Sequence, residues 1–205
     1  MTSNISKKIQ IALSEKQLEL IKQIAFYAQK ERFSLYLVGG IIRDLFLDSP
    51  INDFDLTVVG NAINLAKNIS NNSNATVKIH ERFITATLSW DDFSCDLVTA
   101  RSEIYSTEGS LPIVTPATIQ SDLIRRDFSI NAMACSINQN DFGNLVDPIN
   151  GIEDINNQLI RILHPKSFLD DPTRIIRALR YAAKFKFKFE NETANKLQTA
   201  IEDKK

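Results

Sequence analysis

The sequence has few of the features that mark a secreted, membrane-bound or disordered protein. Its two cysteines, Cys95 and Cys135, are too few for a disulfide framework or a metal knuckle. No apolar run approaches the roughly 18 residues that a membrane-spanning helix requires. The N-terminus leads into no apolar segment of the kind found in a secretory signal. We therefore expect a cytoplasmic protein in a reducing compartment, with no membrane partner.

Net charge is also nearly absent, because 24 basic residues face 25 acidic ones. A near-neutral chain is not simply a nucleic-acid coat, although it can carry a local basic face. The charges are unevenly spread: residues 1–156 hold 13 basic and 19 acidic side chains, and residues 157–205 hold 11 and 6. This division suggests an acidic part suited to metal ions and a basic part suited to polyanions.

What is present, with 43% hydrophobic residues, is the composition of a globular protein with a periodic pattern of helices and strands. The pattern predicts helices at 14–32, 41–46, 63–70, about 152–158, 172–184 and after 190. It predicts strands at 35–40, 52–60, 75–80, 84–90 and 94–100. Residues 102–120, rich in Ser, Thr, Gly and Pro, are expected to form a long functional loop. Strand signals stop at Asp147, so we expect an α/β (α+β) domain over residues 1–145 and a helical segment over residues 146–205.

Two aspartates, Asp53 and Asp55, are the first candidates for chemistry. On a strand, side chains two residues apart lie on one face, so both carboxylates point the same way while Phe54 points to the core. Two neighbouring carboxylates repel each other and favour a cation, and Mg²⁺ prefers hard oxygen ligands of this kind. Taken alone, such a pair is also compatible with the polar end of a strand.

A third aspartate, Asp96, lies on a separate apolar strand between Cys95 and Leu97. A carboxylate is costly to bury alone, and the alternative is an edge strand on which it faces water. If this strand lies beside the strand of Asp53 and Asp55, three carboxylates converge. Such a cluster can hold a pair of metal ions that clamp the attacking and leaving oxygens in phosphoryl transfer.

Gly39 and Gly40 separate an expected strand from an expected helix. Glycine lets a ligand approach the backbone closely, and the free N–H groups at a helix start attract phosphate. Arg43, one turn into the helix, can add a charge-assisted contact. The alternative is a tight turn followed by a surface pair of Arg43 and Asp44.

Arg125 and Arg126 form a basic pair in front of an apolar element. Asp127 can cap that element, and the two arginines are suited to a triphosphate. A solvated run of charges is the alternative for this segment.

The last strong motif begins at Asp171, which suits an N-cap, with Pro172 at the first helical position. Arg174, Arg177 and Arg180 then recur every three residues and form one stripe that drifts slowly around the helix. Few helices need an arginine at each turn without an acid four residues away. We therefore expect the stripe to face an anion.

Four segments, in this order, closely resemble the class II tRNA nucleotidyltransferases and bacterial poly(A) polymerases, which belong to the DNA polymerase β-like nucleotidyltransferase superfamily. They read LVGGIIRDLFLDSPINDFDLTVVG, SCDLVTARSE, DLIRRDFSINAMA and DDPTRIIRALRYAAKF. The resemblance covers about residues 33–200. It implies a head domain with a mixed sheet over residues 1–145 and an incomplete helical neck over residues 146–205.

The resemblance also implies roles for individual residues. The catalytic and metal-binding acids of the family match Asp53, Asp55 and Asp96. The implied nucleotide-binding residues are Gly39, Gly40, Arg43, Asp44, Arg126, Asp127, Asn131, Asp171, Arg174, Arg177 and Arg180. Of these, Asp171 and Arg174 match the pair that reads the edge of the base, in the manner of a protein template. Asp170 stands where the family usually has Glu.

The implied activity is template-independent addition of CMP or AMP, from CTP or ATP, to the 3′ end of tRNA, with release of pyrophosphate. Two Mg²⁺ ions would activate the attacking hydroxyl and neutralise the leaving group. The head motifs do not separate CCA, CC or A addition from poly(A) polymerase activity. Residues 102–120 resemble the flexible loop that relatives use for A addition, which favours an A-capable enzyme.

Two alternatives lie outside this activity. One is a nucleotide- or RNA-binding module without catalysis, against which the three acids argue. The other is an antibiotic-modifying nucleotidyltransferase, which would lack the helix of Asp171 and Arg174. Relatives also carry body and tail domains that grip the tRNA acceptor arm. We therefore expect a truncated chain that stops within the neck, binds nucleotide and grips RNA weakly.

Overall fold

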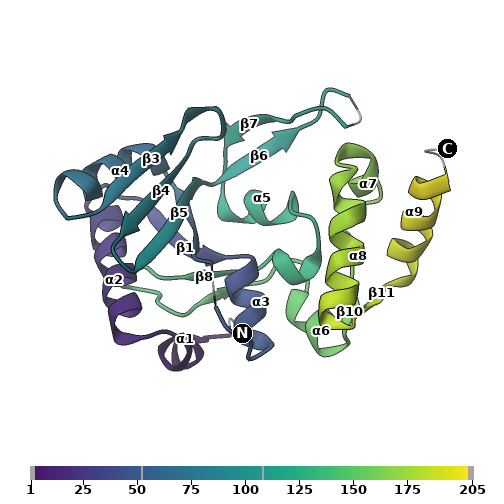
Figure 1. The fold of residues 1–205 in the computed structure, drawn as a ribbon, viewed down its shortest axis with the longest axis horizontal. Coiled ribbons are helices and arrows are strands. Elements are labelled where there is room, and N and C mark those ends of the chain that lie inside the picture. Colours follow the sequence, from purple (N-terminus) through teal and green to yellow (C-terminus); the bar gives the residue numbers. More distant parts are fainter. Residues whose placement is uncertain (1–2, 52, 108, 203–205) are drawn as a thin grey trace.

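The structure is a computed structural model that describes residues 3–51, 53–107 and 109–202. A part built on a β-sheet is followed by a helical part at the C-terminal end (Figure 1). In the described ranges, no helix is both long and apolar enough to cross a membrane. Asn52, the first residue of the strand predicted at 52–60, lies outside the described residues.

A mixed sheet of seven strands forms the first part. In chain order these strands are β1 (Ser34–Val38), β2 (Asp55–Val59), β3 (Thr76–His80), β4 (Thr85–Trp90), β5 (Phe93–Thr99), β8 (Ala134–Ser136) and β9 (Leu145–Val146). Across the sheet they run β3-β4-β5-β2-β1-β8-β9. Only β2 and β5 pair in parallel among these neighbours. The mixed sheet predicted from the sequence is thereby confirmed.

The helices of the first part cover the sheet and connect its strands. They are α1 (Ser6–Ala12), α2 (Glu15–Lys30), α3 (Gly40–Phe46), α4 (Ala62–Asn71) and α5 (Ile119–Ile124), with short 3₁₀ turns at Glu81–Phe83 and Ser129–Asn131. Helix α2 begins with a capping box, in which Ser14 and Gln17 each bond the backbone N–H of the other. It packs against β1, and α4 packs against β3, β4 and β5.

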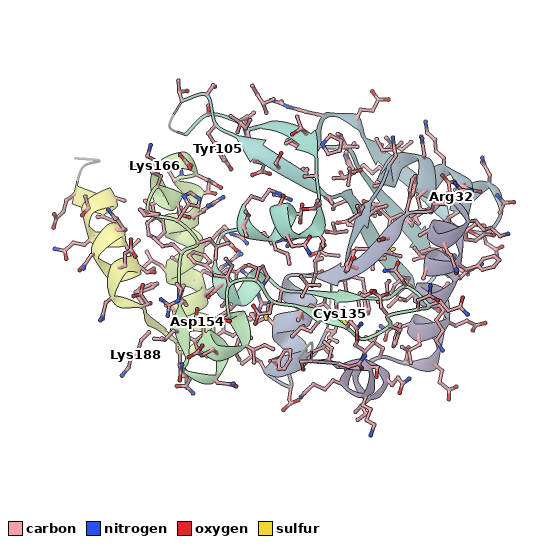
Figure 2. All side chains as sticks on the ribbon, turned by 180° about the vertical axis from the view of Figure 1, so that it is seen from behind. Arg32, Tyr105, Cys135, Asp154, Lys166 and Lys188 are labelled. Carbon is pink, nitrogen blue, oxygen red and sulfur yellow. The ribbon has the colours of Figure 1, made fainter. Side chains whose placement is uncertain are left out.

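Alternation along the strands decides which side chains enter the core. In β5, Cys95 and Leu97 are buried whereas Asp96 is exposed on the other face, as expected for a half-buried strand. Both cysteines are free and buried. Burial raises the pKa of the Cys135 thiol to about 12, and Cys135 lies within the sheet part (Figure 2).

The helical part contains α6 (Gly151–Asn156), α7 (Ser167–Asp170), α8 (Thr173–Phe185) and α9 (Asn191–Glu202). It meets the first part where α6 packs against α3 and the Ser129–Asn131 turn. Asp154 of α6 is buried at this junction, where it accepts hydrogen bonds from Ser129 and Arg161 (Figure 2). The helices predicted in this segment are confirmed, whereas the domain boundary at residue 145 stays a prediction.

Two expectations about local structure are wrong. Residues 102–120 are not one long loop, because β6 (Arg101–Ile104) and β7 (Ile113–Pro116) pair as an antiparallel ribbon and α5 starts at Ile119. The ribbon buries neither face, so it shows no alternation of apolar residues. Strands also continue beyond Asp147, as a parallel pair of β10 (Leu159–Ile160) and β11 (Lys188–Phe189). Strands of two residues are too short to produce a periodic pattern.

The position of β1 in the sheet generates a stability prediction. Leu37 is fully buried in β1, between β2 and β8. We expect Leu37→Ala to lower the free energy of unfolding by about 2–5 kcal/mol, because it leaves a cavity in the core. Urea denaturation would measure this. Ile11→Ala, at a site that is 86% exposed, is the control and should leave stability nearly unchanged; an equal loss in both variants would contradict this account of the core.

Candidate active site

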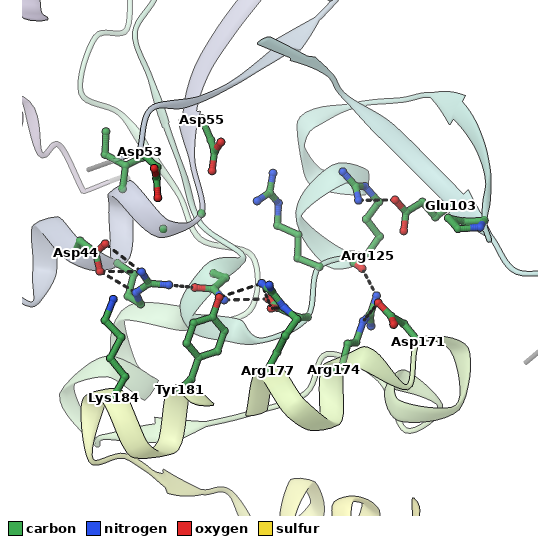
Figure 3. Close-up of a pocket in the computed structure, with 18 of the residues that line it drawn as sticks. Asp44, Asp53, Asp55, Glu103, Arg125, Asp171, Arg174, Arg177, Tyr181 and Lys184 are labelled. Atoms are coloured by element: carbon green, nitrogen blue, oxygen red, sulfur yellow. Dashed lines mark hydrogen bonds and ion pairs between the residues drawn. The ribbon is translucent and has the colours of Figure 1, made fainter. Parts of the chain in front are cut away.

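A cavity of about 560 Å³ lies between the sheet part and α8 (Figure 3). Its walls come from the β1–α3 junction, the start of β2, the β6–β7 ribbon, the segment after α5, and α8. The predicted site residues that line it are Gly39, Gly40, Arg43, Asp44, Asp53, Asp55, Arg126, Asp127, Asn131, Asp171, Arg174 and Arg177. The predicted site residues Asp96 and Arg180 do not line the cavity. Segments from residue 39 to residue 177 thus converge on one site.

The acid pair of the cavity stands at the start of β2. Asp55 is the first residue of the strand and Asp53 precedes it, so the strand begins later than expected. Phe54 between them is 5% exposed and packs edge-on against Phe93, with ring centroids 4.8 Å apart. Phe54 therefore points to the core as predicted, and both carboxylates face the cavity (Figure 3).

Asp96 lies in the same row of the sheet as Asp55. The two residues are paired in the parallel register of β2 and β5. Thr87, opposite Asp96 on β4, donates a hydrogen bond of 2.6 Å to the Asp96 carboxylate. Burial raises the pKa of Asp55, and the nearby charges of Asp96 and Asp53 add to this effect, whereas the Arg126 guanidinium opposes it.

These carboxylates suit a divalent cation by their chemistry. In the part of the chain that the structure describes, no three His, Cys, Asp or Glu side chains already form a metal-binding group. However, Asp53 and Asp55 offer hard oxygen atoms to the cavity, and the repulsion among them and Asp96 is what a cation relieves. The acids therefore fit Mg²⁺, with Asp96 beside the pair that faces the cavity.

The turn between β1 and α3 requires glycine at one position. Gly39 has a φ of +69°, in the region that side chains rarely adopt. A Cβ atom there would lie 2.8 Å from the Nη1 atom of Arg126. The glycine thus lets the Arg126 guanidinium pass directly over the backbone, at the start of α3.

Arg43 is not part of a surface ion pair, which excludes the simpler interpretation of this segment. It is 6% exposed and bonds the carboxylate of Asp44 through Nε at 2.9 Å and Nη2 at 3.0 Å. Its Nη1 atom donates to the Asn131 side chain at 2.5 Å. The guanidinium lies over the rings of Tyr181, 5.4 Å away, and Phe185, 4.8 Å away. Arg43 therefore ties the β1–α3 corner to α8.

A buried carboxylate on α5, which sequence reasoning missed, orients the arginine pair. Asp122 is fully buried; its Oδ1 atom accepts from Arg125 Nη2 at 2.6 Å and its Oδ2 atom from Arg126 Nη2 at 2.9 Å. Burial alone would raise the pKa of Asp122, but the Arg126 and Arg125 guanidiniums hold it below its usual range. Arg125 also lines the cavity, so the pair is not a solvated run of charges.

The β6–β7 ribbon supplies further wall residues that sequence reasoning did not single out. Glu103 of β6 accepts hydrogen bonds from Arg125 at 2.7 Å and from Tyr105 at 3.0 Å. Burial, with the Glu103 carboxylate, raises the pKa of Tyr105 to about 12. The region expected to be a flexible loop is thus anchored to the arginine pair.

The start of α8 forms the opposite end of the cavity. The helix begins at Thr173 with Pro172 as its N-cap, one residue later than predicted. Asp171 still supports this start, because its Oδ1 atom accepts from the Thr173 backbone N–H at 2.9 Å. Its Oδ2 atom lies 3.7 Å from Arg174 Nε. Arg174 is 4% exposed and donates to Ser167 and to the Arg125 carbonyl.

The arginine stripe on α8 is only partly directed at the cavity. Arg177 lines the cavity and donates to Asp127 at 2.8 Å and to the Tyr181 hydroxyl at 2.9 Å. Arg180 is exposed outside the lining. Residues seven apart lie on one face of a helix, so Tyr181 shares the face of Arg174. Arg180, six residues after Arg174, points in a different direction. The drift of the stripe therefore takes Arg180 out of the cavity lining, and nucleotide binding by Arg180 stays a prediction.

Comparisons with a family model and with known proteins indicate the same family. Residues 35–161 match the family model described as the poly A polymerase head domain. An A-adding tRNA nucleotidyltransferase of Halalkalibacterium halodurans is 42% identical over 95% of this chain and 46% of its own length. That of Aquifex aeolicus is 44% identical over 81% of this chain and 20% of its own length. The chain thus spans less than half the length of these relatives.

Solved structures agree with the sequence matches. A CCA-adding enzyme in apo form II has a TM-score of 0.93 and 36% identity, and the match covers 99% of this chain and 48% of that one. A CCA-adding enzyme in complex with ATP has a TM-score of 0.88 and 35% identity, covering 99% and 46%. The family resemblance and the fold class predicted from the sequence are confirmed.

The Asp122 geometry predicts a defect that exceeds lost stability. We expect Asp122→Asn to lower the free energy of unfolding by about 3–5 kcal/mol, because the partly buried Arg126 loses its ion-pair partner and Arg125 keeps only Glu103. We also expect weaker binding of ATP, used as the anionic probe in calorimetry. Asp154→Asn is the matched control, since Asp154 is 2% exposed and pairs with Arg161 away from the cavity. Equal ATP affinity in the two variants would contradict an orienting role for Asp122.

Proposed function

The chain belongs to the poly A polymerase head-domain family of nucleotidyltransferases, and from this premise we propose that it transfers a nucleoside monophosphate from a triphosphate to the 3′ end of RNA. One observation supports this most directly: Asp53 and Asp55 face a cavity that is also lined by arginines. Carboxylates that attract a divalent cation, beside guanidiniums that attract phosphate, are the two requirements of phosphoryl transfer.

The reaction forms one P–O bond and breaks another. The 3′-oxygen of the RNA attacks the α-phosphorus of the nucleotide, its proton passes to solvent, and the bond to the bridging oxygen of pyrophosphate breaks. Asp53, Asp55 and Asp96 would hold Mg²⁺, which lowers the pKa of the attacking hydroxyl and neutralises charge on the leaving group. The Arg126 guanidinium, which opposes the rise in the Asp55 pKa, helps to keep that carboxylate ionised as a ligand.

The two ends of the cavity suggest how the nucleotide lies. At one end, Asp171 and Arg174 offer a carboxylate oxygen and a guanidinium side by side, which suits the hydrogen-bonding edge of a base. At the other end, Gly39 and Gly40 line the cavity with the Arg126 guanidinium close to the Gly39 backbone, an arrangement that suits phosphate. The remaining nucleotide contacts that we propose are those of Arg43, Asp44, Arg126, Asp127, Asn131, Arg177 and Arg180.

We propose AMP addition to tRNA as the specific reaction. Both curated relatives described above are A-adding tRNA nucleotidyltransferases, and the β6–β7 ribbon occupies the region that resembles the loop used for A addition. The head would comprise residues 1–145 and the neck residues 146–205. As the compartment we propose the cytoplasm, because tRNA maturation takes place there and both cysteines are free.

Mass spectrometry of the product would test this reaction. Two tRNA substrates, one ending in CC and one lacking CCA, are incubated at saturating concentration with ATP, CTP and Mg²⁺. We expect a single AMP on the CC-ending tRNA and no change in the other. Addition of CMP would instead indicate a CCA- or CC-adding enzyme, and a long tract of AMP would indicate a poly(A) polymerase. Absence of any transfer would contradict the proposed function.

The acid pair gives the first mutational prediction. We expect Asp53→Ala or Asp55→Ala to lower nucleotide incorporation by about 10³-fold or more, because the lost metal contacts account for several kcal/mol of charge stabilisation. The thermal midpoint should not fall, since neither carboxylate has a protein hydrogen bond among those of the described residues. Asp91→Ala, at an exposed aspartate outside the cavity, should behave as wild type. Full incorporation by either acid variant refutes the assignment.

The end of the cavity that we propose to read the base gives the second mutational prediction. Asp171→Ala should reduce discrimination between ATP and the other triphosphates by about tenfold or more, the value of a hydrogen bond to a charged group, and should lower the rate less. Asp171 is a cleaner target than Arg174, which is buried and also supports Ser167 and Arg125. Competition among the four triphosphates in a primer-extension assay measures selection. Asp170→Ala is the control, because Asp170 precedes Asp171 in the chain but does not line the cavity. Unchanged selection between the triphosphates in Asp171→Ala would mean that another group reads the base.

A further inference from the structure

The charges around the cavity leave little free cation for a nucleotide. Among the described residues, six cationic side chains line it, namely Arg43, Arg125, Arg126, Arg174, Arg177 and Lys184. Six acidic side chains line it as well, namely Asp44, Asp53, Asp55, Glu103, Asp127 and Asp171. A triphosphate carries several negative charges, so its binding depends on which of these cations the protein has not already paired.

Most of the guanidiniums are held by protein acceptors. All three nitrogens of Arg43 donate, to Asp44 and Asn131, and its flat faces are covered by aromatic rings. Arg125 is divided between Asp122 and Glu103. These side chains are rigid and already compensated, so they shape the cavity and contribute little uncompensated charge.

Arg174 and Arg177 are committed in the same way. Arg174 donates to Ser167 and to a backbone carbonyl, and Arg177 pairs with Asp127 at 2.6 Å. Arg126 keeps more freedom, because only its Nη2 atom is bonded and its Nη1 atom lies over Gly39. The phosphate end of the cavity therefore has one partly free guanidinium.

Among the residues that the structure describes, Lys184 is the cavity cation without a protein counter-charge. Across the residues that the structure describes, no hydrogen bond or ion pair within 4.0 Å involves its ammonium group. The side chain is exposed and extends from the last turn of α8 toward the Asp44 corner of the cavity (Figure 3). An ammonium with three unbonded donors at the edge of the cavity is available to phosphate oxygens.

The phase of α8 explains why this lysine faces inward. Lys184 follows Arg177 by seven residues, so the two side chains lie on one face two turns apart. The distance along the helix from Arg174 to Lys184 is about 15 Å, at 1.5 Å per residue. The cavity face of α8 is thus long enough for a base at one end and a chain of phosphates at the other.

We propose that Lys184 binds the terminal phosphates of the incoming nucleotide, a role that rests on the proposed function of the cavity. It would lie beside Arg126 and the Gly39–Gly40 backbone and would be released with pyrophosphate. Lys184 also suits the negative end of the α8 dipole and lies near the Phe185 ring at 5.2 Å. That preference does not account for its position, because Lys186 and Lys188 follow at the same end of α8 and line no part of the cavity.

Binding of two phosphate probes would test this role. Lys184→Gln removes the charge and keeps the length of the side chain, and Lys188→Gln, at an exposed lysine in β11, is the control for net charge (Figure 2). By calorimetry with Mg²⁺, we expect Lys184→Gln to lower the affinity for ATP and for inorganic tripolyphosphate by about tenfold each. Lys184→Arg should restore most of the affinity, and Lys188→Gln should match wild type.

Enzyme kinetics distinguish a contact with the nucleotide phosphates from a contact with RNA at Lys184. We expect the KM for ATP to rise in Lys184→Gln, with unchanged selection between the bases and an unchanged KM for tRNA. A rise in the KM for tRNA alone would show that Lys184 binds an RNA phosphate and would overturn the proposal. So would equal ATP affinity in the Lys184→Gln and Lys188→Gln variants. If wild type binds tripolyphosphate through Lys184 but transfers no nucleotide, the proposed function fails and the phosphate site stands.

Discussion

The buried carboxylate of Asp122 is the constraint on which the rest of the site depends. One of its oxygens accepts a hydrogen bond from Arg125 and the other accepts one from Arg126. Because Asp122 is fully buried, separating its carboxylate from these guanidiniums would be costly. Through Arg125 the β6–β7 ribbon is fixed at Glu103. Through Arg126 a guanidinium is placed over Gly39, whose φ of +69° favours glycine. A single ion cluster therefore sets the distance between three walls of the cavity.

The cavity is also the junction of the two parts of the chain. Arg43 from the sheet part lies over Tyr181, and Arg177 from α8 pairs with Asp127. Each contact joins a charged group on one side to a counter-charge or a ring on the other. The cavity that we propose as the nucleotide site is consequently formed by the same contacts that dock the helical part. The acid pair stays outside this network and remains free for a cation.

Much of the fold could be predicted from the sequence, since the main strands and helices have strong local patterns. Leu37 and Leu56 lie in apolar runs that mark buried strands, and Ser14 with Gln17 marks the start of α2. The β6–β7 ribbon escaped detection because both of its faces are at least partly exposed and it has no apolar alternation. The motif residues of the site were found because their types are chemically special, with glycine at a turn and paired acids before a strand.

What the sequence by itself determined is the family and the order of the main elements, because these depend on local spacing and residue type. Only the tertiary structure decided which charges are free. Asp122 appears in the sequence as one more acid on a helix, and Lys184 as one more lysine at a helix end. The packing of α5 and α8 against the sheet part neutralises Arg43, Arg125 and their neighbours, and leaves Lys184 unpaired among the residues that the structure describes. Pairing of charges is a long-range property, so no local pattern can contain it.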